Sequence, residues 1–192
     1  AAADYLLCLV DGTLSHAEPV TARASVDPAR TVSEVRAHDH IADDIVCPAV
    51  DLGALATAAQ LLGLGRRMLA IAAEHAIART QFGRPIGSFQ AVKHHLADVA
   101  IAVEMARPLV YGAAVGLDGG APAGTHVARD VAAAKVAAAD AAYLASRRSL
   151  QVLGAIGYTA DHDLSLYLTK TRALVTAWGT PAAHRARILE SL

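Results

Sequence analysis

The sequence predicts a mainly α-helical protein in which a helical bundle follows the end of a small β-domain. Up to about Val46, short apolar runs alternate with prolines and polar turns, as in a β-rich segment. From Leu52 onward, long Ala/Leu/Val stretches recur at helical spacing. We therefore expect two domains, one covering residues 1–48 and the other covering residues 49–192.

The β-rich part begins with a predicted hairpin. Tyr5 to Val10 is an apolar run, Asp11-Gly12 favours the left-handed backbone of a tight turn, and Thr13 to Val20 is the return strand. In the second part, breaks at glycine and proline predict five helices, at residues 50–78, 88–116, 125–153, 163–177 and 181–191. Apolar residues, many of them alanine, surround each helix, so we expect a closely packed bundle that shares a subunit interface.

Composition excludes several classes of protein. The 192 residues have a formal charge of −1 and scattered Lys and Arg, which excludes a basic surface for nucleic acid or an anionic membrane. Cys8 and Cys47 have no metal-binding spacing and indicate two reduced, buried thiols, which favours a cytoplasmic location. No apolar run reaches the ~18 residues of a membrane span, and the first residues lack a secretory signal. We expect a soluble protein without a metal site.

A first motif lies between the first two predicted helices and runs Arg79-Thr-Gln-Phe-Gly-Arg-Pro-Ile-Gly-Ser-Phe-Gln90. A guanidinium can hold a pyrophosphate through two parallel hydrogen bonds, and a helix N-terminus near Ser88 offers free N–H groups to an anion. Taken alone, these residues would also suit a helix-capping arginine and a structural Phe-Gly turn.

A second motif, Gln151-Val-Leu-Gly-Ala-Ile-Gly-Tyr158, follows the third predicted helix. Its glycines let the backbone approach a ligand closely, and the amide of Gln151 offers both a donor and an acceptor. The same glycines also serve as a helix stop, which does not exclude a binding role.

In their order and separation, the two motifs resemble the C-terminal half of the acyl-CoA dehydrogenase family, over about residues 51–192. Members of this family are flavoproteins that form the 2,3 double bond of an acyl-CoA thioester. The resemblance implies a helical bundle of the acyl-CoA dehydrogenase type, FAD as cofactor and an acyl-CoA as substrate. Family members are about twice as long, so we expect a fragment, a natural half-protein or an incompletely described chain.

The resemblance also implies which residues contact the cofactor. In the family, the first motif meets the FAD of a neighbouring subunit, the second lies against adenosine and pyrophosphate, and a turn near the C-terminus adds further contacts. Ala155 replaces the usual second glycine, and Gly179 corresponds to a substrate-side position. The implied cofactor residues are Arg79, Thr80, Gln81, Phe82, Phe89, Gln90, Gln151, Val152, Leu153, Gly154, Ala155, Thr180, Pro181 and Ala182.

The catalytic base is missing from both positions at which the family carries it. Dehydrogenation needs a base to remove the α-proton while the flavin accepts hydride from the β-carbon. The resemblance places the usual glutamate at Trp178, or on the preceding helix at Gly53, and neither residue accepts a proton. Trp178 is either a core or interface anchor or a plug of a vestigial acyl pocket. Asp51 is a substitute base only if its helix starts irregularly, because two residues rotate a side chain by about 200°.

Residues 158–167 resemble, in part, a Thr-Trp-Glu-His-Asp-x-His-Leu-Tyr stretch of a divergent bacterial branch of the family. Some members of that branch act on bulky thioesters such as steroid side chains. Ala160 and Asp161 replace Trp-Glu, and Ser165 replaces the second His. His162 is expected to fix its loop by a hydrogen bond, and Glu104 is expected on a solvated or intersubunit helix face.

Three functions remain open. In the first, the chain is a dehydrogenase subunit for lipid or steroid degradation, in a hetero-oligomer, typically a tetramer, whose homologous partner supplies the base. In the second, it is an independently active homo-oligomer with an unusual base. In the third, it is a noncatalytic subunit that keeps the fold for assembly.

Overall fold

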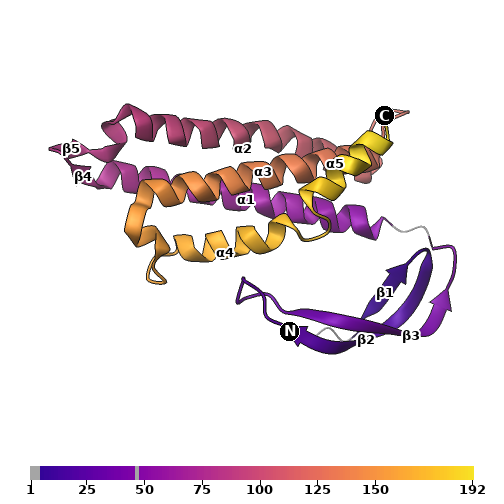
Figure 1. Ribbon diagram of the computed structural model, residues 1–192. Helices are drawn as coiled ribbons and strands as arrows, with labels where there is room; N and C mark the ends of the chain where they lie inside the picture. Colours follow the sequence, from indigo (N-terminus) through magenta and orange to yellow (C-terminus); the bar gives the residue numbers. More distant parts are fainter. Residues whose placement is uncertain (1–4, 46–47) are drawn as a thin grey trace. The chain divides into compact units, whose positions relative to one another are not determined.

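The computed structural model describes residues 5–45 and 48–192, which fall into two compact units (Figure 1). The first unit ends at Ala49 and the second runs from Val50 to Leu192, so the division lies close to the expected boundary.

The first unit is an antiparallel sheet of three strands in the order β1-β2-β3, which are β1 (Leu7–Val10), β2 (Thr13–Arg23) and β3 (Val32–Ala42). Its predicted first hairpin is confirmed, because Val10 pairs with Thr13 across a two-residue turn. In that turn Asp11 and Gly12 have φ values of 48° and 82°, the left-handed backbone that such hairpins require.

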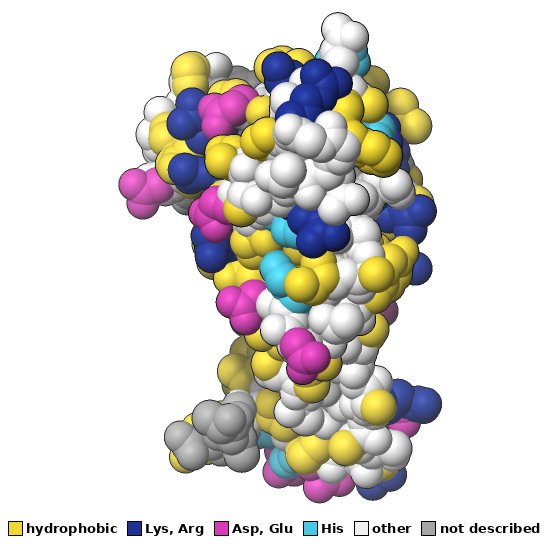
Figure 2. All heavy atoms as spheres, turned by 90° about the vertical axis from the view of Figure 1, so that its left-hand side faces the viewer, with side chains coloured by type: hydrophobic (Ala, Val, Ile, Leu, Met, Phe, Trp, Pro, Cys, Tyr) yellow, Lys and Arg dark blue, Asp and Glu magenta, His cyan; other side chains and the backbone are white. Residues whose placement is uncertain are grey.

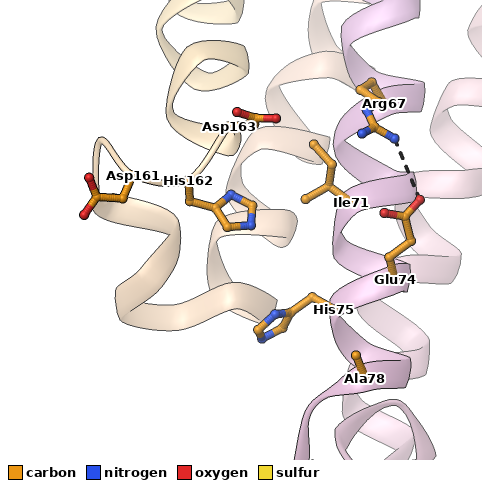
Figure 3. A pocket seen from close by; sticks show the side chains of 8 residues that line it. All are labelled: Arg67, Ile71, Glu74, His75, Ala78, Asp161, His162 and Asp163. Atoms are coloured by element: carbon orange, nitrogen blue, oxygen red, sulfur yellow. Dashed lines mark ion pairs between the residues drawn. The ribbon is translucent and has the colours of Figure 1, made fainter.

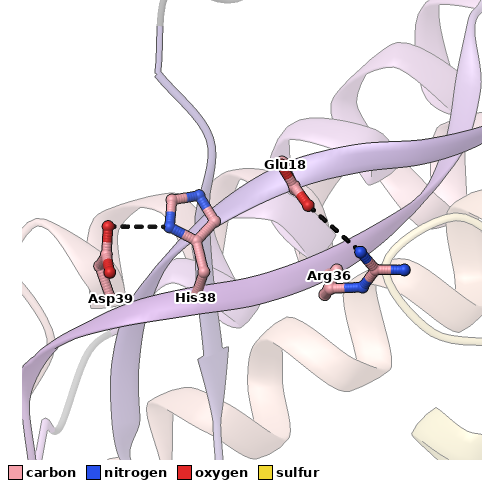
Figure 4. A network of polar contacts seen from close by, with 4 residues as sticks. All are labelled: Glu18, Arg36, His38 and Asp39. Carbon is pink, nitrogen blue, oxygen red and sulfur yellow. Dashed lines mark hydrogen bonds and ion pairs between the residues drawn. The ribbon is translucent and has the colours of Figure 1, made fainter.

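Ion pairs lie along the central strand β2 and the edge strand β3 of this sheet (Figure 4). Arg36 Nη1 lies 3.4 Å from Glu18 Oε1, and His38 Nδ1 lies 3.1 Å from Asp39 Oδ2. The four side chains are exposed, and exposed pairs contribute roughly 0–1 kcal/mol each. The strand register therefore depends on backbone pairing more than on these charges.

The prediction of two buried thiols can be checked for one of the two cysteines. Cys8 is a free thiol on β1, but it is half-buried rather than buried, because β1 is an edge strand with one side open. Cys47 lies outside the described residues, so its predicted state stays a prediction.

The second unit is helical and confirms the mainly α fold class. All five predicted helices are present, and each observed end lies within two residues of its prediction: α1 (Ala49–Ala78), α2 (Gln90–Leu117), α3 (Val127–Leu153), α4 (Leu164–Val175) and α5 (Pro181–Glu190). Short elements join them, namely β4 (Thr80–Gln81), β5 (Arg84–Pro85) and the 3₁₀ helix η1 (Ile86–Ser88) before α2, and the 3₁₀ helix η2 (Gly154–Tyr158) after α3.

Small residues let the three long helices pack closely. A Cβ added to Gly65 on α1 would lie 3.2 Å from Val103 Cγ2 on α2 and 3.6 Å from Ala142 Cα on α3. Alanines make up most of the buried face of α3, and helix separation falls as the side chains at the contact become smaller. The core of the bundle is therefore held by close backbone approach, with larger side chains such as Leu61 and Met68 filling the remaining space.

Helix α2 has the length and composition of a membrane span and is the one such helix in the described part of the chain. One face of it, formed by Val99, Val103, Ala106, Val110 and Ala113, is buried in the helical unit. A buried face of this kind is also typical of a core helix in a globular domain, which passes the same test of length and hydropathy.

The close approach at Gly65 gives a stability prediction. Gly65→Leu should lower the free energy of unfolding by about 1–3 kcal/mol, because the new side chain must push α2 and α3 apart. Gly63→Leu on the same helix is the control, since nothing lies within 4 Å of a Cβ at Gly63. Urea unfolding followed by circular dichroism measures both, and equal stability of the two variants would contradict the packing argument.

Candidate functional site

The two sequence motifs lie at the same end of the helical unit (Figure 1). The hairpin β4–β5 follows the C-terminus of α1, and η2 follows the C-terminus of α3. His75, in the last turn of α1, lies near Arg79 of the first motif and His162 of the loop that follows η2. Burial lowers the pKa of His75, and the nearby charges of Arg79 and His162 lower it further.

The first motif forms a two-residue hairpin docked on α1. Thr80 pairs with Pro85 and Gln81 with Arg84, around a turn in which Phe82 and Gly83 have φ values of 53° and 77°. These are the left-handed conformations that tight hairpin turns need.

Aromatic contacts join the turn of this hairpin to Phe89, the residue before α2. The rings of Phe82 and Phe89 meet edge to face at 6.1 Å, and the Arg84 guanidinium lies 4.2 Å from the Phe89 ring centre. A Cβ on Gly87 would lie 3.0 Å from the carbonyl oxygen of Ala76, so η1 packs directly on the α1 backbone. Phe82 is nevertheless 91% exposed, which leaves a large apolar ring on a rigid support.

The cationic and N–H groups of the first motif suit an anion. Arg79 is exposed, and no ion pair to it occurs within residues 5–45 and 48–192. Helix α2 begins after Phe89, and no side chain caps its N-terminus. The first N–H groups of a helix have no partner within it, so they can bind a phosphate beside the guanidinium. These residues therefore fit the pyrophosphate of the expected cofactor.

The second motif divides between surface and core. Gln151 and Ala155 are exposed, and Gly154 ends α3 at φ 64° with open space at its Cβ position. Val152 and Leu153 are only 8% and 5% exposed and belong to the hydrophobic core. The side chains of this pair therefore face the bundle, and only their backbone could meet a ligand.

A cleft of about 510 Å³ separates α1 from the loop before α4 (Figure 3). Arg67 and Glu74, an ion pair at 3.7 Å, line it together with His75 and His162. His162 Nδ1 accepts a hydrogen bond from the backbone N–H of Leu164 at 3.0 Å, which confirms the predicted loop-fixing role. Figure 2 views the molecule from this end and shows Lys, Arg and His side chains among hydrophobic ones.

The two residues at the expected positions of a catalytic base touch each other. A Cβ on Gly53 would lie only 2.2 to 2.5 Å from three atoms of the Trp178 indole, so the ring rests on the backbone of α1. Only glycine fits at residue 53 beneath this ring. Trp178 itself has φ 56°, an uncommon left-handed conformation for a bulky residue, and is 52% exposed.

The turn between α4 and α5 presents Trp178 in this position. His184 Nε2 donates a hydrogen bond to the carbonyl oxygen of Trp178 at 2.9 Å. A Cβ on Gly179 would lie 2.6 Å from the same nitrogen, and Gly179 has φ 103°, so the turn requires glycine here. Thr180 caps α5 by accepting a hydrogen bond from the N–H of Ala183 at 3.1 Å.

Pro181 follows at the start of α5 and Ala182 is exposed, so the expected cofactor residues of this turn also build the helix start. Two further residues contact the turn, His184 of α5 and Lys135 of α3, and neither was predicted because neither lies in a motif. Both are buried, and the Lys135 ammonium donates to backbone carbonyls of the turn.

Asp51 is engaged elsewhere. Arg187 of α5 binds both carboxylate oxygens, with Arg187 Nη2 at 3.2 Å from Asp51 Oδ2 and Nη1 on Oδ1. Helix α1 is regular from Ala49, so the irregular start that would redirect Asp51 is absent. The side chain acts as an anchor between α1 and α5 rather than as a free base.

The expected cofactor residues form two groups at opposite ends of α1. Trp178 and its turn contact Gly53 near the start of the helix, whereas Arg79 follows its end. The 25 helical steps from Gly53 to Ala78, the last residue of α1, correspond to about 38 Å, which is longer than one FAD. A single FAD therefore cannot touch both groups of one chain.

Comparison with known families gives a match over most of the chain. Residues 45–192 match the family model described as acyl-CoA dehydrogenase, C-terminal domain. The chain is 34% identical over 176 residues to acyl-CoA dehydrogenase IpdE2 of Mycobacterium tuberculosis, which covers 88% of this chain and 51% of IpdE2. It is also 34% identical over 131 residues to the short-chain acyl-CoA dehydrogenase of Megasphaera elsdenii, covering 68% of this chain and 33% of that protein.

Solved structures show the same fold. The ChsE4-ChsE5 complex from Mycobacterium tuberculosis superposes with a TM-score of 0.83 at 26% identity, covering 97% of this chain and 54% of the matched chain. Butyryl-CoA dehydrogenase from Megasphaera elsdenii superposes with a TM-score of 0.78 at 24% identity, covering 93% and 51%. The chain spans about half the length of these relatives, and the matches confirm the resemblance that the two motifs indicated.

The buried His184 gives a pH prediction. Burial is the main cause that lowers its pKa below 6.5, so the unfolded chain binds a proton more readily than the folded one. Stability from neutral His184 is therefore complete above pH 6.5 and is lost as the pH falls below it. His184→Gln should flatten the fall in melting temperature between pH 6.5 and 5. His126→Gln on the exposed start of α3 is the control, and an unchanged pH profile in His184→Gln would refute this assignment.

Proposed function

We propose, because this chain belongs to the acyl-CoA dehydrogenase family, that it is an FAD-dependent dehydrogenase subunit whose α-proton base comes from a partner subunit. FAD is the cofactor that membership of this family indicates. The observation that carries the proposal is the indole of Trp178 resting on Gly53. This one contact occupies both positions at which the family carries its base. The exposed groups that suit a pyrophosphate, Arg79 and the start of α2, are present.

In this proposal the bound FAD supplies the acceptor for the β-hydride of the thioester. The guanidinium of Arg79 and the free N–H groups at the start of α2 bind the pyrophosphate. The exposed amide of Gln151 and the open backbone at Gly154 lie at the same end of the helical unit and bind the adenosine. No residue of this chain removes the α-proton.

The separation of the two groups supports a partner subunit. One FAD cannot reach from Arg79 to the Trp178 turn of the same chain, so in this proposal the motif end completes a cofactor site on another chain. Phe82, almost fully exposed on its hairpin, is placed to enter such a site. The similar ChsE4-ChsE5 structure is a complex of two differently named chains, which supports a homologous but non-identical partner.

The substrate class within this proposal is a bulky acyl-CoA, including steroid-derived thioesters. The partial match of residues 158–167 to the divergent bacterial branch supports it. The cytoplasm is the proposed location, since acyl-CoA thioesters are metabolised there in bacteria.

A second candidate function is a noncatalytic structural subunit of the same complex. The closed Trp178–Gly53 contact favours it, because it leaves this chain without a base. The two candidates differ in whether the motif end binds FAD.

The deciding experiment compares visible absorption spectra of the chain purified alone and co-expressed with a homologue that carries the glutamate base. We expect flavin absorption in the co-purified complex and its bleaching on addition of an acyl-CoA. A stable complex without flavin would exclude the dehydrogenase proposal and establish the structural one. Flavin bleaching by this chain alone would show that it contains a base.

Arg79→Ala should weaken FAD binding by the complex about tenfold to hundredfold, because a charge-assisted contact to the pyrophosphate is lost. The matched control is Arg107→Ala on α2, where the guanidinium pairs with Glu104 at 2.9 Å on an exposed face. Titration of the flavin-free complex with FAD measures both variants. Equal affinities for the two variants would remove Arg79 from the site.

Asp51→Asn should leave the turnover number of the complex within about twofold of the parent, because the carboxylate is an anchor for Arg187 and not the base. Its melting temperature should fall modestly as that pair weakens. Steady-state oxidation of an acyl-CoA with an artificial electron acceptor measures turnover. A loss of several orders of magnitude would instead make Asp51 the base.

A further inference from the structure

Lys135 is fully buried in the middle of α3 and faces backbone oxygens rather than a carboxylate. Its ammonium Nζ donates to the carbonyl oxygen of Val175 at 2.9 Å and to those of Leu174 and Gly179 at 3.4 Å each. The side chain is 0% exposed, and no ion pair to it is found in the described ranges. A buried lysine without a counter-charge is rare in proteins.

The three oxygens belong to the two sides of one turn. Leu174 and Val175 end α4, where the negative end of the helix dipole attracts a cation. The Leu174 carbonyl accepts from the backbone N–H of Ala177 at 3.2 Å as well as from the ammonium. Gly179 lies on the far side, just before α5. One ammonium therefore joins the turn's entry to its exit, and Trp178 lies in the segment between them.

Packing does not explain this lysine. Burial lowers its pKa to about 8, which means that the surroundings disfavour its charge. An apolar side chain of similar length would fill the same space without that cost, and such replacements of buried charges are often neutral or stabilising. The contacts that distinguish lysine from such a side chain are those of its ammonium with the three carbonyl oxygens.

We propose that Lys135 is a positioning residue that holds the Trp178 indole against Gly53 by binding the backbone on both sides of the turn. The left-handed φ of Trp178 costs free energy, and the ammonium supplies the contacts that keep the turn in this conformation. The consequence for function is that the indole keeps the expected base site of this subunit closed, and this consequence rests on the proposed function. The positioning itself can be tested without cofactor or partner.

The charged neighbours of the turn come from two further helices. His184 of α5 donates to the Trp178 carbonyl, and the positive charge of Lys135 contributes to the lowered pKa of His184. Arg187 of α5 and Asp51 of α1 also act on His184. His184 changes charge below pH 6.5 and Lys135 near pH 8, so their effects on the turn fall in separate ranges.

Trp178 is the only tryptophan, so fluorescence excited at the red edge of its absorption, where the five tyrosines do not absorb, reports this turn alone. In the parent chain, acrylamide quenching of Trp178 should about double between pH 7 and 9.5, as Lys135 loses its proton and the turn opens locally. His184→Gln should keep this step, which separates it from the histidine. The measurement needs no variant of Lys135 and therefore remains decisive if such variants fail to fold.

Lys135→Met should show the higher quenching already at pH 7 and no step near pH 8, while its helical circular dichroism and melting temperature stay at or above the parent's. Lys93→Met, on the exposed start of α2, is the control and should behave as the parent. Parent-like emission and quenching in folded Lys135→Met, or a flat parent profile between pH 7 and 9.5, would overturn the proposal.

Discussion

The contact between the Trp178 indole and the backbone of Gly53 constrains the rest of the helical unit. It fixes the turn between α4 and α5 against the start of α1, and it admits no side chain at residue 53. The two missing base positions are consequently one structural fact rather than two. A glutamate on α1 would need the indole to leave, and a carboxylate in the turn would leave Gly53 uncovered.

Helix α1 separates the chain's two sets of cofactor-suited residues by most of its length. Near the start of α1 the backbone packs against the Trp178 indole. Near its end, Arg79, Gln151 and Phe82 are exposed. An exposed guanidinium, a helix N-terminus without a side-chain cap and an exposed aromatic ring are groups that a ligand or a second chain can contact. They support the proposal that this end forms half of a cofactor site.

Local chemistry explains which parts were predictable from the sequence. Asp11-Gly12 specifies a hairpin turn, and glycines and prolines mark the helix ends, so these features depend on neighbouring residues only. The burial of Val152 and Leu153 within a surface motif depends on how α3 faces its neighbours, which a motif does not encode.

Long-range features were not predictable in the same way. The two empty base positions could be identified separately, but their contact joins residues from opposite ends of the bundle sequence. Lysine is almost always exposed, so Lys135 among alanines gave no reason to expect a buried ammonium beneath the turn. His184 was missed for a similar reason, because its partner is a backbone carbonyl that appears only once α5 is folded back.

The turn that carries Trp178 contains two features that cost free energy. They bear on the choice between a catalytic and a purely structural subunit. Trp178 has a left-handed backbone, worth roughly 1–3 kcal/mol of strain, and Lys135 is buried without a counter-charge. Natural proteins concentrate such departures from local preference at functional sites and compensate for them elsewhere. A subunit kept only for assembly would need close helix packing, which Gly65 and the alanines of α3 already provide far from the turn. The strained turn therefore supports the view that the shape of this surface, and not the fold alone, is what the chain would contribute to the proposed complex.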